Sequence, residues 1–271
     1  MKNFFLLAFL IININDLFAQ DYELVNDIQY QNDDKDLYLN ERSVLDLYYP
    51  KNIDEFSTII FFHGGGLRNG SKYIPEFLKN KNIAIVAPNY RLSPNVKAPK
   101  YIEDAAAAIA WVFKNIENYG GDKKLIFVSG SSAGGYLTSL IGLDKKYLNR
   151  YNIDADDIAG LIPLTGHTIT HFTIRDEMGI EPLVPLVDEL APLYHVRGDA
   201  PPILLLTGNR ELELLGRYEE NAYLMRMLKL AGHKDVEHLE FDGYGHGISI
   251  PAMPILLKKV NELTKKIKNL N

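Results

Sequence analysis

The chain has 271 residues, of which 46% are hydrophobic, and it contains no cysteine. This length and apolar content suffice for one large domain with a sizeable core, while the lack of cysteine excludes a disulfide framework and a thiolate metal site. The net charge of −6 and the absence of a sustained lysine and arginine cluster argue against nucleic acid or an anionic membrane as the main partner.

The first twenty residues, MKNFFLLAFLIININDLFAQ, have the layout of a secretory signal peptide. One lysine precedes a short apolar run, and Ala19 and Gln20 follow it as a place for cleavage. The run is too short to span a bilayer, so a retained anchor is the less favoured alternative. We therefore expect residues 21–271 to form the mature domain, exported to the periplasm or secreted, with no stable membrane anchor.

Apolar runs rich in β-branched and aromatic residues predict seven strands along the mature chain. They span residues 44–49, 57–62, 83–88, 125–130, 158–164, 202–208 and 237–243. Helical patterns lie between several of them, at 101–120, 132–143 and 216–233. Alternating strands and helices with nearly continuous apolar strands predict an α/β fold, in which helices cover both faces of a mostly parallel sheet.

Residues 166–199 interrupt this alternation with prolines, histidines and mixed charge without a clear period. We interpret them as an insertion over the sheet edge, which can act as a lid and select substrates, because ligands bind at the carboxyl ends of strands in such sheets. His167 and His171 have the i, i+4 spacing of some metal ligands. They lack the intervening glutamate of that pattern and an evident third ligand, so we expect no metal.

The stretch SGSSAGG, residues 129–135, contains one frame of the pattern G-x-S-x-G, which runs from Gly130 to Gly134 and centres on Ser132. This pattern places a nucleophilic serine on a sharp turn between a strand and a helix, and small neighbours allow the chain to bend there. An apolar strand pattern precedes the motif and a helical pattern follows it. Ser132 is therefore the candidate nucleophile, and a helix-capping serine in a glycine-rich turn is the alternative.

A serine nucleophile needs a base for its proton and donors for the oxyanion that forms. His246 lies in FDGYGHG, directly after the last predicted strand, and is the candidate base. His63 opens the motif HGGG, whose glycines can turn backbone N–H groups toward an anion. We expect His63 to order that loop, and His233 and His238 to have structural roles.

The base in turn needs a carboxylate that fixes its tautomer. The stretch TGNRELE, residues 207–213, follows a predicted strand and offers Glu211 and Glu213. We prefer Glu211 because it is nearer to the end of the strand, and we keep Glu213 as the reserve.

With these residues the chain resembles the α/β-hydrolases, and among them the hormone-sensitive-lipase-like esterases and the bacterial carbohydrate esterases. The resemblance extends from about Val44 to the C-terminus and is carried by the motifs LDLYYP, HGGG, NYRLSP, GGDKKLIFVSGSSAGGYL, PPILLLTGNRE and GYGHG. It implies an oxyanion hole made by the backbone N–H groups of Gly65, Gly66 and Ala133. It also places the acid on Glu211, where the family usually has aspartate.

The resemblance implies a serine carboxylesterase that needs no cofactor and no metal. Only about twenty residues separate the expected cleavage site from the first predicted strand, too few for the N-terminal helical cap of the lipase-like members. This favours the branch without a cap, which resembles acetylxylan, pectin-acetyl and feruloyl esterases, so we expect acetyl or similar short acyl esters of carbohydrate as substrates. A dipeptidyl-peptidase-like or arylformamidase-like amide hydrolase, or a catalytically silent carbohydrate-binding relative, are the alternatives.

Overall fold

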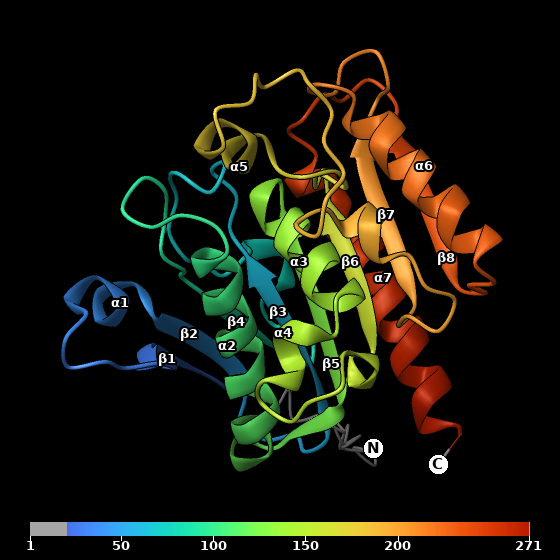
Figure 1. The fold of residues 1–271 in the computed structure, drawn as a ribbon. Helices are drawn as coiled ribbons and strands as arrows, with labels where there is room; N and C mark the ends of the chain where they lie inside the picture. Colours follow the sequence, from blue (N-terminus) through green and yellow to red (C-terminus); the bar gives the residue numbers. More distant parts are fainter. Residues whose placement is uncertain (1–20, 271) are drawn as a thin grey trace, which may run out of the picture.

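The computed structural model describes residues 21–270, which form an eight-stranded sheet with helices on both faces (Figure 1). The strand order is β1-β2-β4-β3-β5-β6-β7-β8. The first two pairings, β1 with β2 and β2 with β4, are antiparallel, and all the others are parallel. The predicted fold class, a mostly parallel α/β sheet, is confirmed; the predicted signal peptide lies outside the described residues.

Each of the seven predicted strands is present, with small differences at the ends. The strands are β1 (Tyr22–Gln29), β2 (Val44–Pro50), β3 (Phe56–Phe62), β4 (Ile83–Pro88), β5 (Gly121–Ser131), β6 (Gly160–Leu164), β7 (Ile203–Gly208) and β8 (Val236–Phe241). The additional strand, β1, forms one edge of the sheet. It escaped prediction because it is short of apolar residues, and no position along it is fully buried.

The helices follow the predicted alternation. They are α1 (Leu37–Arg42), α2 (Lys100–Asn115), α3 (Ala133–Leu143), α4 (Lys146–Asn149), α5 (Phe172–Glu177), α6 (Arg217–Leu230) and α7 (Ser249–Lys268), with 3₁₀ turns at Glu76–Leu78, Ile116–Tyr119, Ala155–Asp157 and Pro192–His195. The helix predicted at 101–120 ends earlier, in a 3₁₀ turn that Gly120 closes with a φ of 91°. Within residues 21–270, no helix is long and apolar enough to cross a membrane.

The sheet separates two apolar cores, because successive side chains of a strand point to opposite faces. Ile60 and Phe62 of β3 pack with α2, α3 and α6, whereas Ile59 and Phe61 pack on the face that α7 covers. All seven residues of β3 are buried. Burial on both faces is the reason that the central strands are apolar over most of their length and do not alternate.

The carboxyl ends of the parallel strands meet at the upper edge of the sheet in Figure 1, where α5 lies. The 166–199 segment crosses this edge and is joined to the body by hydrogen bonds. Thr173 Oγ1 donates to Gly66 O, and Tyr136 Oη of α3 donates to Leu190 O at 2.6 Å. The first bond fixes the segment beside the loop that follows β3, and the second ties it to α3. Its expected role as a lid stays a prediction.

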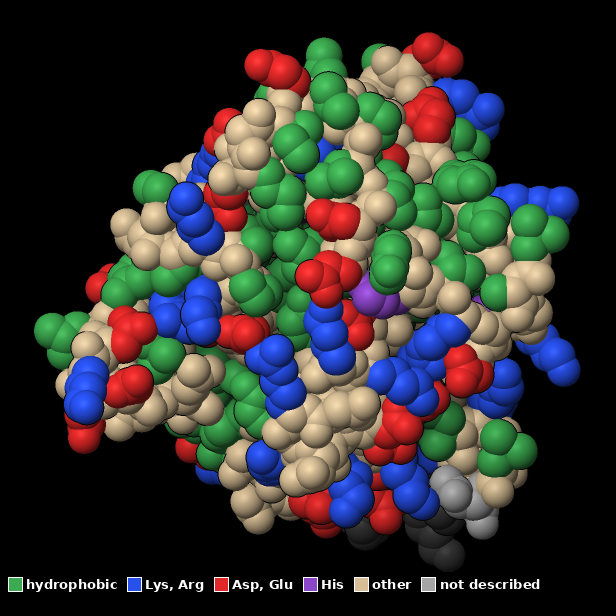
Figure 2. All heavy atoms as spheres, viewed as in Figure 1, with side chains coloured by type: hydrophobic (Ala, Val, Ile, Leu, Met, Phe, Trp, Pro, Cys, Tyr) green, Lys and Arg blue, Asp and Glu red, His purple; other side chains and the backbone are tan. Residues whose placement is uncertain are grey.

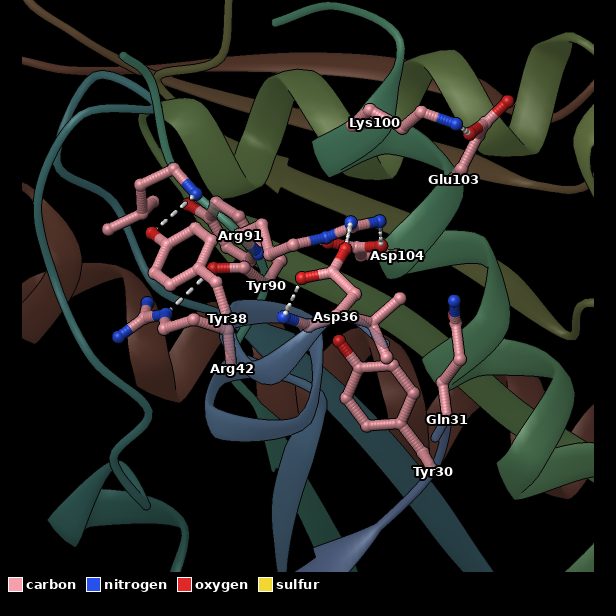
Figure 3. Close-up of polar contacts among 12 residues, drawn as sticks. Tyr30, Gln31, Asp36, Tyr38, Arg42, Tyr90, Arg91, Lys100, Glu103 and Asp104 are labelled. Carbon is pink, nitrogen blue, oxygen red and sulfur yellow. Dashed lines mark hydrogen bonds and ion pairs between the residues drawn. The ribbon is translucent and has the colours of Figure 1, made fainter. Parts of the chain in front are cut away.

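A buried ion pair joins the segment after β4 to α2 (Figure 3). Arg91 binds Asp104 through one edge of its guanidinium group, with Nε to Oδ2 at 2.8 Å and Nη2 to Oδ1 at 2.7 Å. Its Nη1 donates to Asp36, which also caps α1. Arg42 of α1 donates from Nε to Tyr90 O. The N-terminal residues are thereby fastened to the strand that leads into the NYRL motif.

We predict that Asp104→Asn lowers the free energy of unfolding by about 3–5 kcal/mol, because it removes the buried charge partner of Arg91 and leaves only the partly exposed Asp36. Urea unfolding followed by circular dichroism measures this. Glu103→Gln is the matched control on the same helix; its ion pairs with Lys100 and Arg150 are more exposed, so its loss is expected to stay below about 1 kcal/mol. Equal losses in the two variants would contradict the structural role given to Asp104.

Candidate active site

Ser132 lies on the turn between β5 and α3 with strained backbone, at φ 55° and ψ −112°. This conformation is disfavoured for a residue with a side chain and is typical of a nucleophile elbow. The turn presses against the end of β3. A Cβ atom added at Gly130 would lie 2.7 Å from Phe62 O, and one added at Gly134 would be closer still to the same oxygen. Both glycines of the predicted motif are therefore required by the packing of backbone on backbone.

The structure brings His246 to Ser132, although the two residues are 114 positions apart. His246 lies in the loop between β8 and α7, and its Nε2 is 2.9 Å from Ser132 Oγ. This is hydrogen-bonding distance for a general base and its nucleophile. The side chain of His246 is 27% exposed, so the pair is open to a substrate and to water.

The carboxylate on His246 belongs to Glu213, and the preferred assignment of Glu211 is wrong. His246 Nδ1 is 2.6 Å from Glu213 Oε1. After β7 the chain folds into a turn, in which the amides of Leu212 and Glu213 both donate to Asn209 O. The turn carries the side chain of Glu213 back toward the strand end, where Gly208 N donates to its Oε2 at 2.9 Å. Glu211 lies on the outside of this turn and is exposed.

Glu213 is a charged group in a buried position, with a side chain only 1% exposed. Burial raises the pKa of its carboxyl group, but hydrogen bonds from His246 and from the backbone amides of Leu214 and Gly208 outweigh burial and hold the pKa below its ordinary value. An ionised Glu213 accepts from Nδ1–H of His246. That leaves Nε2 as the acceptor that faces Ser132.

Three backbone amides beside Ser132 are available for an oxyanion. Gly65 and Gly66 have φ values of 108° and 64°, and a side chain at Gly65 would collide with Asn69 O. Ala133 is the first residue of α3, where N–H groups have no partner within the helix. Among the described residues, none of these three N–H groups has a backbone or side-chain acceptor.

His63 shapes the loop that carries Gly65 and Gly66. Its ring stacks on Tyr90 with 4.3 Å between the ring centroids, and its Nδ1–H donates to Gly64 O at 2.7 Å. Burial lowers the pKa of His63 to about 4, so the ring is neutral near pH 7. Tyr90 Oη donates to His63 O at 2.8 Å. The Tyr90 of the NYRL motif is thus a support of this loop, a role that the sequence motif alone did not identify.

These groups surround one pocket of about 630 Å³. Its walls are formed by Gly64, Gly65, Gly66, Arg68, Asn69, Ser131, Ser132, Phe172, Leu214, Arg217, His246, Gly247 and Ser249. Phe172 comes from the 166–199 segment, and Arg217 is the first residue of α6. Sequence reasoning did not select either residue, because their contact with the pocket depends on how distant segments pack.

The other histidines have structural surroundings. His167 and His171 are buried and their pKa values are lowered by burial; His167 Nδ1 lies 2.9 Å from Glu220 Oε2. His238 bonds Thr207 Oγ1 at 2.7 Å, and His233 Nε2 bonds backbone carbonyl groups. Over residues 21–270, no group of three side chains has the types and proximity to hold a metal ion.

Comparisons with known proteins find esterases that are similar to this chain. The BD-FAE family model matches residues 45–162. Esterase LipC of Mycobacterium tuberculosis is 26% identical over 215 residues, which cover 71% of this chain and 53% of that protein. The carboxylic ester hydrolase LipM of the same organism is 28% identical and covers 62% of this chain and 44% of its own. The chain spans about half the length of these curated relatives.

Solved structures with the same fold cover nearly the whole chain. Thermogutta terrifontis esterase 2 is 25% identical with a TM-score of 0.70, covering 91% of this chain and 94% of its own. A truncated carbohydrate esterase from gut microbiota is 20% identical with a TM-score of 0.72, covering 90% and 96%. Esterase B of Lactobacillus rhamnosis has a TM-score of 0.74 at 20% identity, covering 92% and 88%. The chain is therefore similar in sequence and in fold to esterases of the α/β-hydrolase type.

Proposed function

We propose that the chain is a serine carboxylesterase that hydrolyses short-chain acyl esters through an acyl-enzyme. The observation that carries this proposal is the continuous contact from Ser132 Oγ through His246 to the buried carboxylate of Glu213. A serine hydroxyl becomes a useful nucleophile when a neighbouring base accepts its proton, and the base requires a group that orients it. The unpaired amides of Gly65, Gly66 and Ala133 supply the oxyanion hole.

In the acylation step, Ser132 Oγ attacks the ester carbonyl carbon while its proton passes to His246 Nε2. The negative charge that develops on the carbonyl oxygen is stabilised by the backbone N–H groups. Glu213 stabilises the imidazolium that forms. His246 then gives its proton to the departing alcohol, and the acyl group stays on Ser132.

In the second step, a water molecule takes the place of the alcohol. His246 accepts a proton from this water as it attacks the acyl carbon, and the same amides hold the second oxyanion. The bond to Ser132 Oγ then breaks, and His246 returns the proton to the serine. The products are a carboxylic acid and the free enzyme, so the cycle requires no metal or organic cofactor.

For the substrate we propose acetyl or similar short acyl groups on carbohydrate. The residues before β2 form β1 and α1 at one edge of the sheet, away from α5 (Figure 1), and none of the described residues before β2 lines the pocket. A pocket that no N-terminal cap lines suits a bulky alcohol such as a polysaccharide. Two solved relatives support the choice by name: one is a carbohydrate esterase, and the other was solved with propionate bound.

The distribution of charge on the surface argues against nucleic acid as the partner. Figure 2 shows hydrophobic side chains gathered toward the upper end of this face, and below them Lys and Arg mixed with Asp and Glu. Exposed apolar residues after α5 are Met178, Leu183, Val184 and Val187. On this face, positive charge is therefore not continuous enough for nucleic acid. We propose a small-molecule or polysaccharide ester as the partner of an exported enzyme.

We predict that the purified mature chain hydrolyses 4-nitrophenyl acetate faster than the butyrate and much faster than the octanoate. Ser132→Ala is expected to lower kcat by about 10³-fold or more, because it removes the nucleophile. Ser131→Ala, which removes the neighbouring hydroxyl bonded to Ser249 Oγ, should lower kcat far less. Matched 4-nitroanilide and formanilide substrates are run beside the esters; faster cleavage of these would favour an amide hydrolase.

Glu213→Gln and Glu211→Gln form a matched pair, since both remove one charge from the same turn. Glu213→Gln is expected to lower kcat by at least a hundredfold and up to about 10⁴-fold, because an amide cannot hold His246 in the required tautomer as a carboxylate does. Glu211→Gln should stay within about twofold, as is usual for an exposed substitution. Steady-state kinetics with the acetyl ester measure kcat of both variants. Equal losses of kcat would refute the assignment of Glu213.

Expression of the full chain in a Gram-negative host tests the export proposal. We expect the protein in the periplasm or the medium, with a mature N-terminus at Gln20 or Asp21, as read by intact mass and N-terminal sequencing. Replacement of Leu6 and Leu7 by aspartate should abolish cleavage, because it interrupts the apolar run. Recovery of the unmodified chain with Met1 from the cytosol would contradict the proposal.

A further inference from the structure

Arg217 is a buried cation in the wall of the Ser132 pocket. It begins α6, is only 1% exposed, and is the largest side chain among the fully buried residues described. The catalytic cycle proposed above gives it no task. Arginine is rarely buried without a charged partner.

The guanidinium group of Arg217 has few partners. Its Nη1 donates to Thr165 O, while Nε is buried without an acceptor, and no ion pair within residues 21–270 includes it. The two carboxylates whose charges act on Arg217 are engaged elsewhere: Glu213 by His246, and Glu220 by His167 and the amide of Thr168. The guanidinium group lines the pocket, and the protein does not provide acceptors for all of its N–H groups.

Arg217 nevertheless keeps its charge. Burial lowers the pKa of its guanidinium group, and the negative charges of Glu220 and Glu213 act in the opposite direction, so that the pKa is about 10. At neutral pH the group is protonated. The pocket wall therefore carries a positive charge that lacks a counterion within ion-pair distance.

A structural role as a tie between α6 and the end of β6 does not require this charge. Asn221, one helical turn later, donates from Nδ2 to Gly166 O at 2.9 Å and makes the same kind of tie with a neutral amide. The other cation in the pocket wall, Arg68, is 40% exposed and paired with Asp176. Arg217 thus differs from Asn221, which is neutral, and from Arg68, which is paired: it is charged, buried and without an ion-pair partner.

We propose that Arg217 binds a carboxylate carried by the ester substrate, and so makes this esterase selective for acidic esters. This inference rests on the proposed function and specifies its substrate class. A planar guanidinium in a place of low polarity forms strong, charge-assisted hydrogen bonds to a carboxylate. The carboxylate resides on either the acyl or the alcohol half of the ester, and the experiment distinguishes the two.

Two pairs of esters test the proposal, and the members of each pair differ only in charge. The acyl-side pair is the 4-nitrophenyl monoester of adipic acid and its terminal amide. The alcohol-side pair is 4-acetoxybenzoate and 4-acetoxybenzamide. We expect kcat/KM of the wild type to favour the carboxylate member of one pair by at least about tenfold, and the pair that responds identifies the half that carries the charge.

Arg217→Met should reduce this preference to about one, and Arg217→Lys should retain part of it. The matched control is Arg226→Met, which removes the same charge from an exposed position of α6 and should leave the ratio unchanged. A wild type without preference in either pair, or an Arg217→Met variant that keeps the preference, would overturn the proposal. A ratio measured within one variant is insensitive to partial loss of folded protein.

Calorimetric titration of the wild type and both Met variants with adipate and 4-hydroxybenzoate gives a readout that does not depend on turnover. Binding that is lost in Arg217→Met and kept in Arg226→Met supports the carboxylate site. If Arg217→Met fails to fold, binding to the wild type that weakens with added salt supports the site. Absence of binding to the wild type overturns it. If carboxylates bind in an Arg217-dependent way but no ester is hydrolysed, the proposed function is refuted and this inference is not. If neutral esters are hydrolysed but carboxylates are neither preferred nor bound, this inference is refuted and the proposed function is not.

Discussion

The close approach of β3 and β5 at their carboxyl ends is the constraint on which the site depends. Phe62 O, the last carbonyl of β3, leaves no room for a side chain at Gly130 or Gly134. A Cβ atom at Gly64 would lie 3.0 Å from Ser131 O, so the loop after β3 is equally tight against the serine turn. Ser132 and the proposed oxyanion donors are therefore held by contacts of backbone with backbone, which allow little relative movement.

Three buried charged groups in the described part of the molecule have different kinds of partner. Arg91 and Asp104 neutralise each other in bidentate geometry and fasten the segment after β4 to α2. Glu213 is stabilised by several donors, one of which is His246. Arg217 has neither a charge partner nor a full set of acceptors. The first arrangement stabilises the scaffold, the second orients the proposed base, and the third leaves binding capacity for a ligand.

The fold and the local motifs follow from the sequence because their causes are local. A central strand buried on both faces must be apolar over most of its length, and a strand-to-helix turn that touches a neighbouring strand must contain glycine; both requirements are visible in a short stretch of chain. The glycine frame around Ser132 and the position of His246 directly after β8 were predictable for this reason. The edge strand β1 was not, since half-exposed positions leave no apolar pattern.

Only the tertiary structure decided which glutamate meets His246 and which cation lies unpaired in the pocket. Glu211 and Glu213 are two residues apart in one turn, and the dihedral angles of that turn determine which side chain points inward, a property that residue type does not encode. Tyr90 supports His63 across a separation of 27 residues. Arg217 likewise reaches the pocket from α6, far along the chain from Ser132. The sequence alone thus determined the sheet, the elbow and the class of chemistry, because each is encoded in short patterns, whereas the final orientation of the acid and the character of the pocket depend on how distant segments pack.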